Sequence, residues 1–585
     1  MPVISVAAVI DTSNPSAWII HLVKRLQQRD CVKLTLVELV DASDAHDTIK
    51  PGGVTHRIGQ WLLGKMDRPL FEQNPWHPGT LADIRATGDD LPLFRYTNSH
   101  TSDATNNDAQ EALAGCEIII NLTEQSIPAN LLPVSTAVIW DAHLETLNTR
   151  IEDALIAQGE LVWVHLWEHR GEQSRRIATH SLPRQTFSAT DLKRSIWFCL
   201  PMLFDSRLNW LANGAQLPAM EFSGASDGST DLDLLYRQAV NDAQWLLLNQ
   251  FTPSSLAAPA RFMRIAKLFW SWTVERYRNR FYYEQWQLAF VHDQSATTSS
   301  PDESTDQADT LRSSSRVTME TLFNRRSRDY QRIDLPDDTW WADPHLFERD
   351  GQMYVFFEQM STADTHGYLS VAKLDSAGQP SEATKILDVG SHLSYPHVFE
   401  HESSVYLIPE STSTGSVSLY KADEFPNKWS FVQNLLSDVD LADSTLHHDG
   451  KRFWMFCNSW SHRTVNERDE LFLFYADSLT GPWQAHPLNP VVTGVDRARM
   501  AGPLIHDGRH WYRASQYGAK RYGYGINLHR IEQLDITSYS ETTSGQILPD
   551  PSSQWLGCHS LSHVHGFTVI DRVTRRLKGR TTTTH

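Results

Sequence analysis

Carboxylate side chains recur at matching places in the second half of the chain. Stacking similar segments puts Asp343 and Asp443 at one repeated place, and Glu358 and Glu410 at a second. Such carboxyl groups do acid–base work on glycosidic bonds, where one acid is protonated and its partner is ionised. We expect Asp343 to be the base or nucleophile, Glu410 to be the acid, and Asp443 to hold the sugar or tune their pKa values. The alternative is that both Asp residues cap turns.

Aromatic and basic side chains accompany these carboxylates. Trp rings stack on the apolar faces of sugars, and a group of Arg in an acidic protein suggests a bound phosphate or carboxylate. A surface ion-pair network would explain the Arg residues equally well. The histidines of the last segment are a weak metal signal, so we expect no metal and no other cofactor. The residues predicted to bind substrate are Trp340, Trp341, Glu358, Tyr395, Arg499, Arg513, Gln516, Arg521, His559 and His563.

An internal repeat positions these residues. Five copies of a strand, a tight turn and a second strand follow one another about every 50 residues, which is typical of propeller blades. The turn residues are Gly351, Ser403, Gly450, Gly508 and Gly566. The strand-like stretch 283–292 should join the last blade and close the ring, because a propeller otherwise leaves an exposed edge. We predict an all-β five-bladed β-propeller over 283–585, with a β-sandwich as the alternative.

The preceding residues have a different pattern. Apolar β-branched runs alternate with helices over 1–220, which predicts a small parallel α/β sheet. A helical connector is expected over 221–282, and the Ser-, Thr- and Asp-rich segment 292–316 is expected to be a flexible loop. The stretch 259–286 is a basic, aromatic helix, which suggests either contact with an anionic membrane surface or packing between two domains.

Composition narrows the functional classes. The chain of 585 residues carries 52 Lys and Arg against 70 Asp and Glu, a formal charge of −18. This acidity argues against nucleic-acid binding. The 5 Cys are few and lack metal-type spacing, so neither disulfides nor zinc are indicated. The amino terminus lacks a signal-peptide pattern and no long apolar run occurs. We expect a cytoplasmic protein, peripheral to the inner membrane if the basic helix binds lipid.

Two family resemblances become visible in these segments. The motifs WWADPHLF, SYPHVFE, YLIPES and DELFLFYAD within 283–571 resemble the propeller domain of glucosamine inositolphosphorylceramide transferases. They are more distantly similar to arabinanase and fructosidase-type glycoside hydrolases, which carry two Asp and a Glu acid. Asp343 matches the first Asp of those hydrolases, but the order Asp343, Glu410, Asp443 departs from theirs.

The first 200 or so residues resemble a formyltransferase-like, Rossmann-like domain. Formyltransferases carry an N-x-H motif followed by a loop and a catalytic Asp. Here the stretch Trp140-Asp141-Ala142-His143 keeps His143 and lacks the Asn. The resemblance therefore implies a degenerate scaffold, and sugar N-formyl transfer is the least favoured activity.

Two functional hypotheses remain open at this stage. One is an enzyme of glycan or polysaccharide biosynthesis that performs glycosyl transfer or glycoside processing in the propeller. The other is a non-catalytic module that binds a glycan or sugar nucleotide for a partner transferase. The expected partner in either case is a glycan, a sugar phosphate or a nucleotide sugar.

Overall fold

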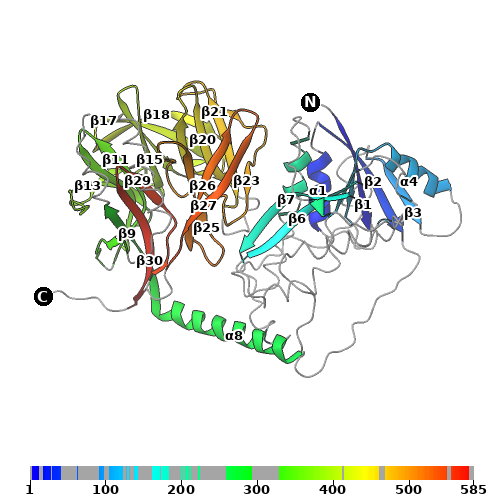
Figure 1. Ribbon diagram of the computed structural model, residues 1–585, viewed down its shortest axis with the longest axis horizontal. Coiled ribbons are helices and arrows are strands. Elements are labelled where there is room, and N and C mark those ends of the chain that lie inside the picture. Colours follow the sequence, from blue (N-terminus) through cyan, green and yellow to red (C-terminus); the bar gives the residue numbers. More distant parts are fainter. Residues whose placement is uncertain are drawn as a thin grey trace, which may run out of the picture. The chain divides into compact units, whose positions relative to one another are not determined.

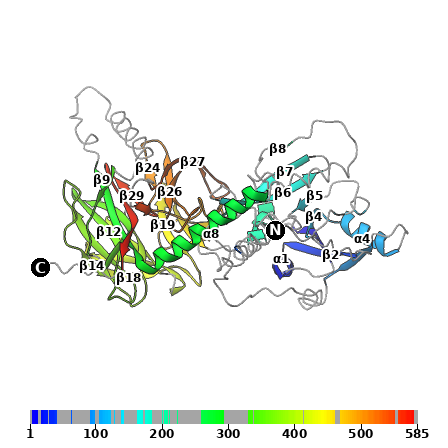
Figure 2. The ribbon, with the colours of Figure 1, turned by 90° about the horizontal axis from the view of Figure 1, so that it is seen from below.

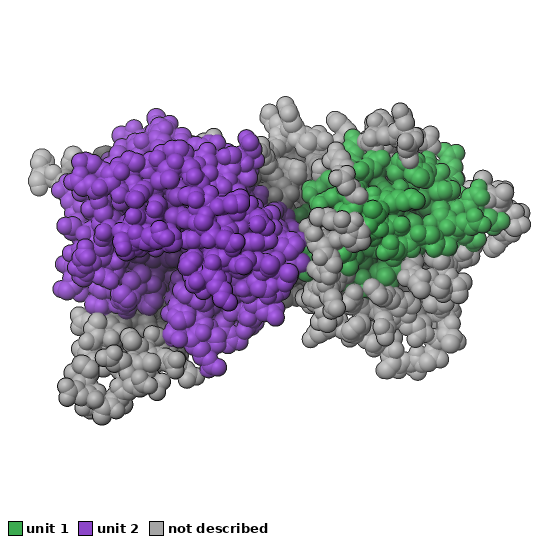
Figure 3. Space-filling model, turned by 90° about the horizontal axis from the view of Figure 1, so that it is seen from above, with its two compact units in different colours: residues 1–275 green, residues 276–585 purple. Residues whose placement is uncertain are grey.

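The computed structural model divides into two compact units, Met1–Glu275 and Arg276–His585 (Figures 1 and 3). The residues that it describes are 3–11, 17–27, 29, 31–40, 62, 91–97, 104–122 and 127, 131, 138–141, 161–170, 173–183, parts of 199–211, 222–223, 258–292, 329–336, 338–411, 414–459, 468–549 and 555–578. His143 and the predicted loop 292–316, apart from its first residue, lie outside them, as does most of the predicted connector before residue 258. The predicted three-part division of the chain stays a prediction.

The first unit contains an eight-stranded sheet in the order β3-β2-β1-β4-β5-β6-β7-β8. Strands β1 to β5 pair in parallel, and β6 to β8 extend the sheet in antiparallel fashion (Figure 2). The elements are β1 Ile4–Asp11, α1 Ala17–Gln27, β2 Val32–Val40, β3 Leu93–Thr97, α4 Ala104–Ala114, β4 Ile118–Asn121, β5 Val138–Asp141, β6 Leu161–Arg170, β7 Gln173–Pro183 and β8 Phe222–Ser223.

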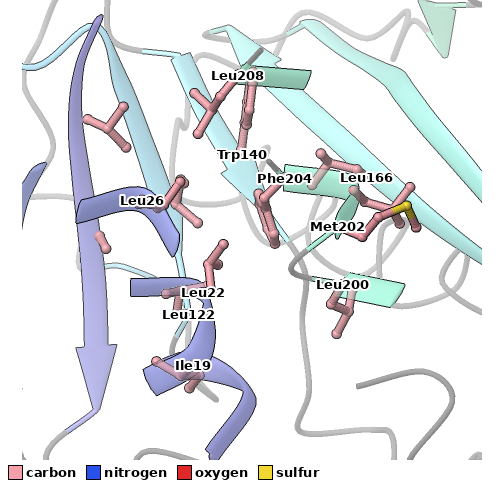
Figure 4. Close-up of a cluster of buried hydrophobic side chains, with 14 of the residues drawn as sticks. Ile19, Leu22, Leu26, Leu122, Trp140, Leu166, Leu200, Met202, Phe204 and Leu208 are labelled. Carbon is pink, nitrogen blue, oxygen red and sulfur yellow. The ribbon is translucent and has the colours of Figure 1, made fainter. Parts of the chain in front are cut away.

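Both faces of this sheet are buried, as its apolar strands require. Alternate residues of β1 point to opposite faces: Val6 and Ala8 join one core with Leu22 of α1, while Ala7 and Val9 join another that includes Leu113 of α4. Figure 4 shows the first core around Trp140 and Phe204. The sheet has the α/β character predicted from the sequence, and its formyltransferase-like identity stays a prediction.

A long helix leads directly into the propeller. Helix α8 spans Ala258–Phe281 and β9 begins at the next residue, covering Tyr282–His292. The helix predicted to reach residue 286 therefore ends five residues earlier, because β9 is drawn into a sheet. Within the described part of the chain, no helix combines the length and apolar character needed to cross a membrane.

The second unit is a five-bladed β-propeller, as predicted, since its strands form five separate sheets. Blade 1 combines β28 Trp555–Gly557, β29 Leu561–Val564, β30 Phe567–Leu577, β9 and β10 Gln331–Arg332. Blade 2 holds β11 Thr339–Arg349, β12 Gln352–Ser361, β13 Tyr368–Leu374 and β14 Thr384–Leu387. Blade 3 holds β15 Ser394–His401, β16 Ser404–Glu410, β17 Ser416–Glu424 and β18 Lys428–Ser437. Blade 4 holds β19 Ala442–His448, β20 Phe453–Ser459, β21 Glu470–Ala476, β22 Gln484–Ala485 and β23 Val492–Thr493. Blade 5 holds β24 Ile505–His506, β25 Trp511–Tyr517, β26 Gly525–Leu534 and β27 Tyr539–Ile547.

Blade 1 closes the ring with strands from both ends of the unit. Strand β9 pairs with β30 along its whole length, from Tyr282 opposite Leu577 to His292 opposite Phe567. This confirms that the stretch 283–292 joins the last blade. The pairing removes the exposed edge that β30 would otherwise present.

Candidate functional site

A repeated β-bulge positions the candidate residues. In β11, β15 and β19 the register slips after Ala342, Ser394 and Ala442, and the next residue has a positive φ: Asp343 51°, Tyr395 43° and Asp443 52°. These strands contact one another between blades and are therefore the inner ones. The residues that pair with the bulge are Glu358, Glu410 and Asn458, which confirms the second repeated place. Bulges of this kind re-aim side chains next to active sites.

We use the name axial cluster for seven charged residues that meet between the inner strands: Asp343, Glu358, Glu410, Asp443, Asp571, Arg499 and His559. Each has an electrostatic or hydrogen-bonding link to another member. They come from all five blades, because Asp571 and His559 lie in blade 1 and Arg499 precedes β24 of blade 5.

Glu410 and Asp443 form an acid–base pair. Burial and the charge of Asp443 raise the pKa of Glu410 well above its usual range, so Glu410 keeps its proton and is hydrogen-bonded to Asp443. Burial opposes ionisation of Asp443, but Arg499 and the Glu410 hydrogen bond lower its pKa. Arg499 Nε donates to Asp443 Oδ2 at 2.7 Å. One carboxyl of the pair is thus an acid and the other an anion.

Asp343, in blade 2, is held by blades 1 and 3. Its Oδ1 accepts a hydrogen bond from Ser560 Oγ at 2.6 Å, and its Oδ2 accepts one from the backbone N–H of Tyr395 at 3.3 Å. Its own N–H donates to Asp571 Oδ2 at 3.1 Å. Burial raises the pKa of Asp343, and the charge of His559 opposes this shift. The Asp343 residue therefore connects neighbouring blades, in addition to any role of its carboxylate in a reaction.

His559 lies between two carboxylates. Its Nδ1 is 2.5 Å from Asp571 Oδ2, and its Nε2 is 3.6 Å from Asp343 Oδ1. Burial alone would lower the pKa of His559, but the charges of Asp571 and Asp343 raise it to about 9. The ring is therefore a buried imidazolium at neutral pH.

Within the described residues, these three side chains are also close enough together to act as metal ligands. The ligand atoms of Asp343, His559 and Asp571 lie within 4.8 Å of one another. Asp571 also accepts the backbone N–H groups of His559 and Ser560 at 2.8 and 3.0 Å. In the structure, the His559 ring lies in ion-pair contact with both carboxylates.

Aromatic rings border the cluster, but they differ from those predicted. Tyr522 is 36% exposed, and Trp286 and Tyr522 both contact the His559 ring, with centroids 4.2 and 5.2 Å away. Desolvation and the nearby carboxylates, including Asp343 and Asp443, hold the pKa of the Tyr522 hydroxyl well above its usual range. Tyr522, Trp286 and Asp571 were missed as site residues. Their sequence signal is weak because they lie outside the aligned places of the repeat.

Three of the predicted binding residues have side chains that are engaged inside the propeller, and their binding role stays a prediction. Trp341 packs on Phe357 in the core between blades 1 and 2, so its ring is covered. The Tyr395 hydroxyl is 2.9 Å from Thr445 Oγ1 and accepts the Gly502 N–H at 2.8 Å. Arg513 is fully buried and directs its five N–H groups at Glu541, two backbone carbonyls and Met500.

The other predicted ligands keep their binding role as a prediction. Trp340 donates to the backbone carbonyl of Glu284 at 2.9 Å, and Arg521 forms a two-pronged ion pair with Glu284. Gln516 donates to the Met500 carbonyl at 3.2 Å, and its Oε1 is buried without a partner. His563 lies on β29, with Nδ1 2.8 Å from Thr568 Oγ1. Of the predicted binding residues, Glu358, Arg499 and His559 belong to the axial cluster.

Comparison with known proteins points to one family for the propeller. The family model described as glucosamine inositolphosphorylceramide transferase 1, N-terminal, matches residues 286–558, which is under half of the chain. Glucosamine inositolphosphorylceramide transferase 1 of Oryza sativa subsp. japonica is 32% identical over 203 residues, or 34% of this chain and 27% of the relative. The Arabidopsis thaliana protein of that name is 33% identical over 205 residues, or 34% and 26%.

The chain spans about a quarter of the length of these curated relatives. Among solved structures, an exo-1,5-alpha-L-arabinanase from a bovine ruminal metagenomic library is 14% identical and covers 42% of this chain and 95% of that chain, with a TM-score of 0.30. The beta-xylosidase RS223 is 10% identical and covers 41% and 93%, with a TM-score of 0.32. The propeller is thus similar in sequence to the N-terminal region of the glucosamine inositolphosphorylceramide transferases.

Proposed function

We propose that the propeller is carbohydrate-active and transfers a proton at a glycosidic or activated-sugar bond in the axial cluster. The feature that carries this proposal is the Glu410–Asp443 pair, two hydrogen-bonded carboxyl groups of which one has a raised pKa and the other a lowered pKa. Glycoside chemistry uses this division between a proton donor and a charged partner. Glu410 donates its proton to the leaving-group oxygen, and Asp443 keeps Glu410 protonated between turnovers.

The similarity to named transferases supports a sugar derivative as the ligand. The relatives are called glucosamine inositolphosphorylceramide transferases. With Glu410 protonated and the pKa of Glu358 raised to about 8, three further carboxyl groups face two cations, Arg499 and His559. These three are Asp343, Asp443 and Asp571, and their small excess over the cations favours a neutral sugar or an amino sugar. A phosphate or an acidic sugar would meet net negative charge there. This favours neutral and amino sugars over the predicted sugar phosphates and nucleotide sugars.

A binding module without catalysis is the second candidate function. It is favoured by Asp343, whose two oxygens are engaged by Ser560 and by the Tyr395 N–H. A carboxylate that ties blades together in this way contributes to the shape of the site without taking part in a reaction. Such a module would present a glycan to a partner transferase.

Substitution of the acid separates the two functions. The wild-type chain and Glu410→Gln are incubated with a panel of aryl glycosides and sugar nucleotides, and turnover is followed by mass spectrometry. Loss of a general acid lowers turnover by about 10²- to 10⁴-fold, whereas ligand binding measured by calorimetry should change little. The control is His506→Gln, an exposed residue outside the axial cluster. Saturable binding with no turnover by the wild type would favour the binding module.

We also infer that α8 contacts an anionic lipid surface. Trp270 is 69% exposed, and Met263 and Tyr277, seven residues before and after it, are exposed on the same line of the helix. Ile265 points to the opposite side and is buried in the core of the first unit. The exposed Lys267, Arg278 and Arg280 accompany the aromatic line. Apolar rings bordered by cations fit the interface of an anionic bilayer.

A further inference from the structure

Glu358 occupies the place in blade 2 that Glu410 occupies in blade 3. Glu358 pairs with Ala342 before one bulge, and Glu410 pairs with Ser394 before the next. Glu410 is hydrogen-bonded to Asp443, whereas the neighbour of the Glu358 carboxyl group is a half-exposed histidine. This neighbour is His392, whose Nε2 lies 3.5 Å from Glu358 Oε1.

The backbone fixes the protonation pattern of His392. The N–H of Gly367 donates to His392 Nδ1 at 3.0 Å, so Nδ1 must be unprotonated. A neutral imidazole then carries its proton on Nε2, the atom nearest to Glu358. Burial lowers the pKa of His392, which keeps the ring neutral although its side chain is 51% exposed.

Gly367 leaves room for this contact. A Cβ at residue 367 would lie 2.6 Å from Glu358 Oε1 and 2.9 Å from His392 Cε1. Both distances are shorter than atoms tolerate, so a larger residue would force the Glu358 carboxyl group or the His392 ring to shift. The backbone of Gly367 does not require glycine for its conformation, since it is absent from the positive-φ residues. Space for the side-chain pair explains the glycine.

We infer that Glu358 is the second acid–base group of the axial cluster, and that His392 is its positioning residue. This inference rests on the proposed function, in which Glu410 gives a proton to the leaving oxygen. Ionised Glu358 then takes the proton from the attacking hydroxyl as the new bond to the sugar forms. The O–H bond of the attacking group breaks, a carboxyl O–H bond forms on Glu358, and solvent takes the proton afterwards.

The charges around Glu358 suit a general base. Burial, Asp343 and Asp571 raise the pKa of Glu358 to about 8, and His559 opposes them. A base is most effective when its pKa lies near the working pH. The Nε2 of His392 lies 3.5 Å from Glu358 Oε1, and the positive end of an N–H dipole beside a carboxyl group favours its ionised form.

The test is a titration of the glutamate carboxyl groups in the full-length chain labelled with ¹³C-glutamate. We expect one carboxyl resonance that titrates near pH 8 and is missing from Glu358→Gln. In His392→Phe this pKa should rise by about 0.5 to 1 pH unit, since the N–H dipole beside the carboxyl group is lost. His392→Gln keeps a donor and should restore the wild-type value.

A matched control isolates the contact with Glu358. His506 Nδ1 also accepts a glycine N–H, that of Gly508 at 3.2 Å, but His506 lies outside the axial cluster. His506→Phe should therefore leave the resonance near pH 8 unchanged. The inference is overturned if Glu358→Gln removes no such resonance, or if His392→Phe leaves its pKa at the wild-type value. Absence of sugar turnover in the wild type would instead count against the proposed function, because the titration needs no substrate.

Discussion

The His559 imidazolium links the stability of the propeller to pH. The ring is buried between Asp571 and Asp343, and its pKa is raised to about 9 from the usual histidine value of about 6.5. A group with a raised folded-state pKa stabilises the protein fully below its unfolded pKa, and this contribution is lost as the pH rises through the folded value. The relevant window is therefore roughly pH 6.5 to 9.

The free energy of unfolding should fall across this window. The pKa shift of His559 corresponds to a loss on the order of 3 kcal/mol at most. Urea unfolding at pH 6.5 and at pH 9.5, followed by tryptophan fluorescence, measures this loss. His559→Gln should be less stable at pH 6.5 and should show a smaller loss on going to pH 9.5. An equal loss in wild type and variant would show that other groups cause it. His506→Gln serves as the control, because its side chain is exposed.

Residues at repeated places were predictable from the sequence, and residues outside them were not. Glu358, Glu410, Asp343 and Asp443 align because the repeat brings equivalent positions to the same point of every blade. Asp571 lies on β30, whose partner β9 stands almost 300 residues earlier in the sequence. Tyr522 lies in the connection between β25 and β26. A hairpin pattern in the sequence predicts the two strands but not the path of the connection between them.

At the scale of elements, β9 is the strand on which the ring depends. It lies between β30 and β10, so its backbone groups are paired on both sides. Ala289 pairs with Ile570 on one side and with Arg332 on the other. Turn residues and the alternation of apolar and polar residues in the sequence predicted such strands well. The bulges and positive φ values depend on contacts between blades, so the sequence shows no pattern for them.

Proline at residue 289 should open the ring. It removes a backbone donor within a central strand and leaves its acceptor unpaired, which costs about 1 to 3 kcal/mol, and the Tm of the propeller should fall by about 5 °C. Thermal unfolding followed by circular dichroism measures the change. Ala289→Gly keeps the N–H and should lower the Tm far less. Equal Tm values for Ala289→Pro and wild type would contradict closure through β9.

Helix α8 is testable with lipid vesicles. The full-length chain should float with vesicles of phosphatidylcholine and phosphatidylglycerol, and should not float with phosphatidylcholine alone. Trp270→Ser and the double variant Arg278→Glu, Arg280→Glu should each lose most of this binding, and added salt should weaken it. Trp511→Ser replaces an exposed Trp of blade 5 and should bind as the wild type does. A different result would assign this face to a second copy of the chain: the wild type self-associates and does not bind vesicles, and Trp270→Ser no longer self-associates.

The charge of the whole molecule and that of its axial cluster have the same sign. The chain carries −18 formally. In the cluster, apart from protonated Glu410 and from Glu358 with its pKa of about 8, three carboxyl groups face the two cations Arg499 and His559. Long-range attraction and local contacts then favour the same ligands. We therefore expect a cationic sugar to be favoured over a phosphorylated sugar both in its approach to the protein and in its binding.

A matched set of oligosaccharides tests this selectivity on the full-length chain. A glucosamine trimer should bind more tightly than its N-acetylated form, by about fivefold at low salt if one ammonium–carboxylate pair contributes about 1 kcal/mol. The difference should shrink as salt rises, because the screening length falls to about 10 Å at 0.1 M. Calorimetry at two salt concentrations measures both effects. Asp443→Asn leaves Arg499 without its carboxylate partner and should reduce the preference for the amine. If the wild type binds a phosphorylated sugar more tightly than the glucosamine trimer, the charge argument is wrong. That result would instead support the anion-binding role predicted for Arg499 from the sequence.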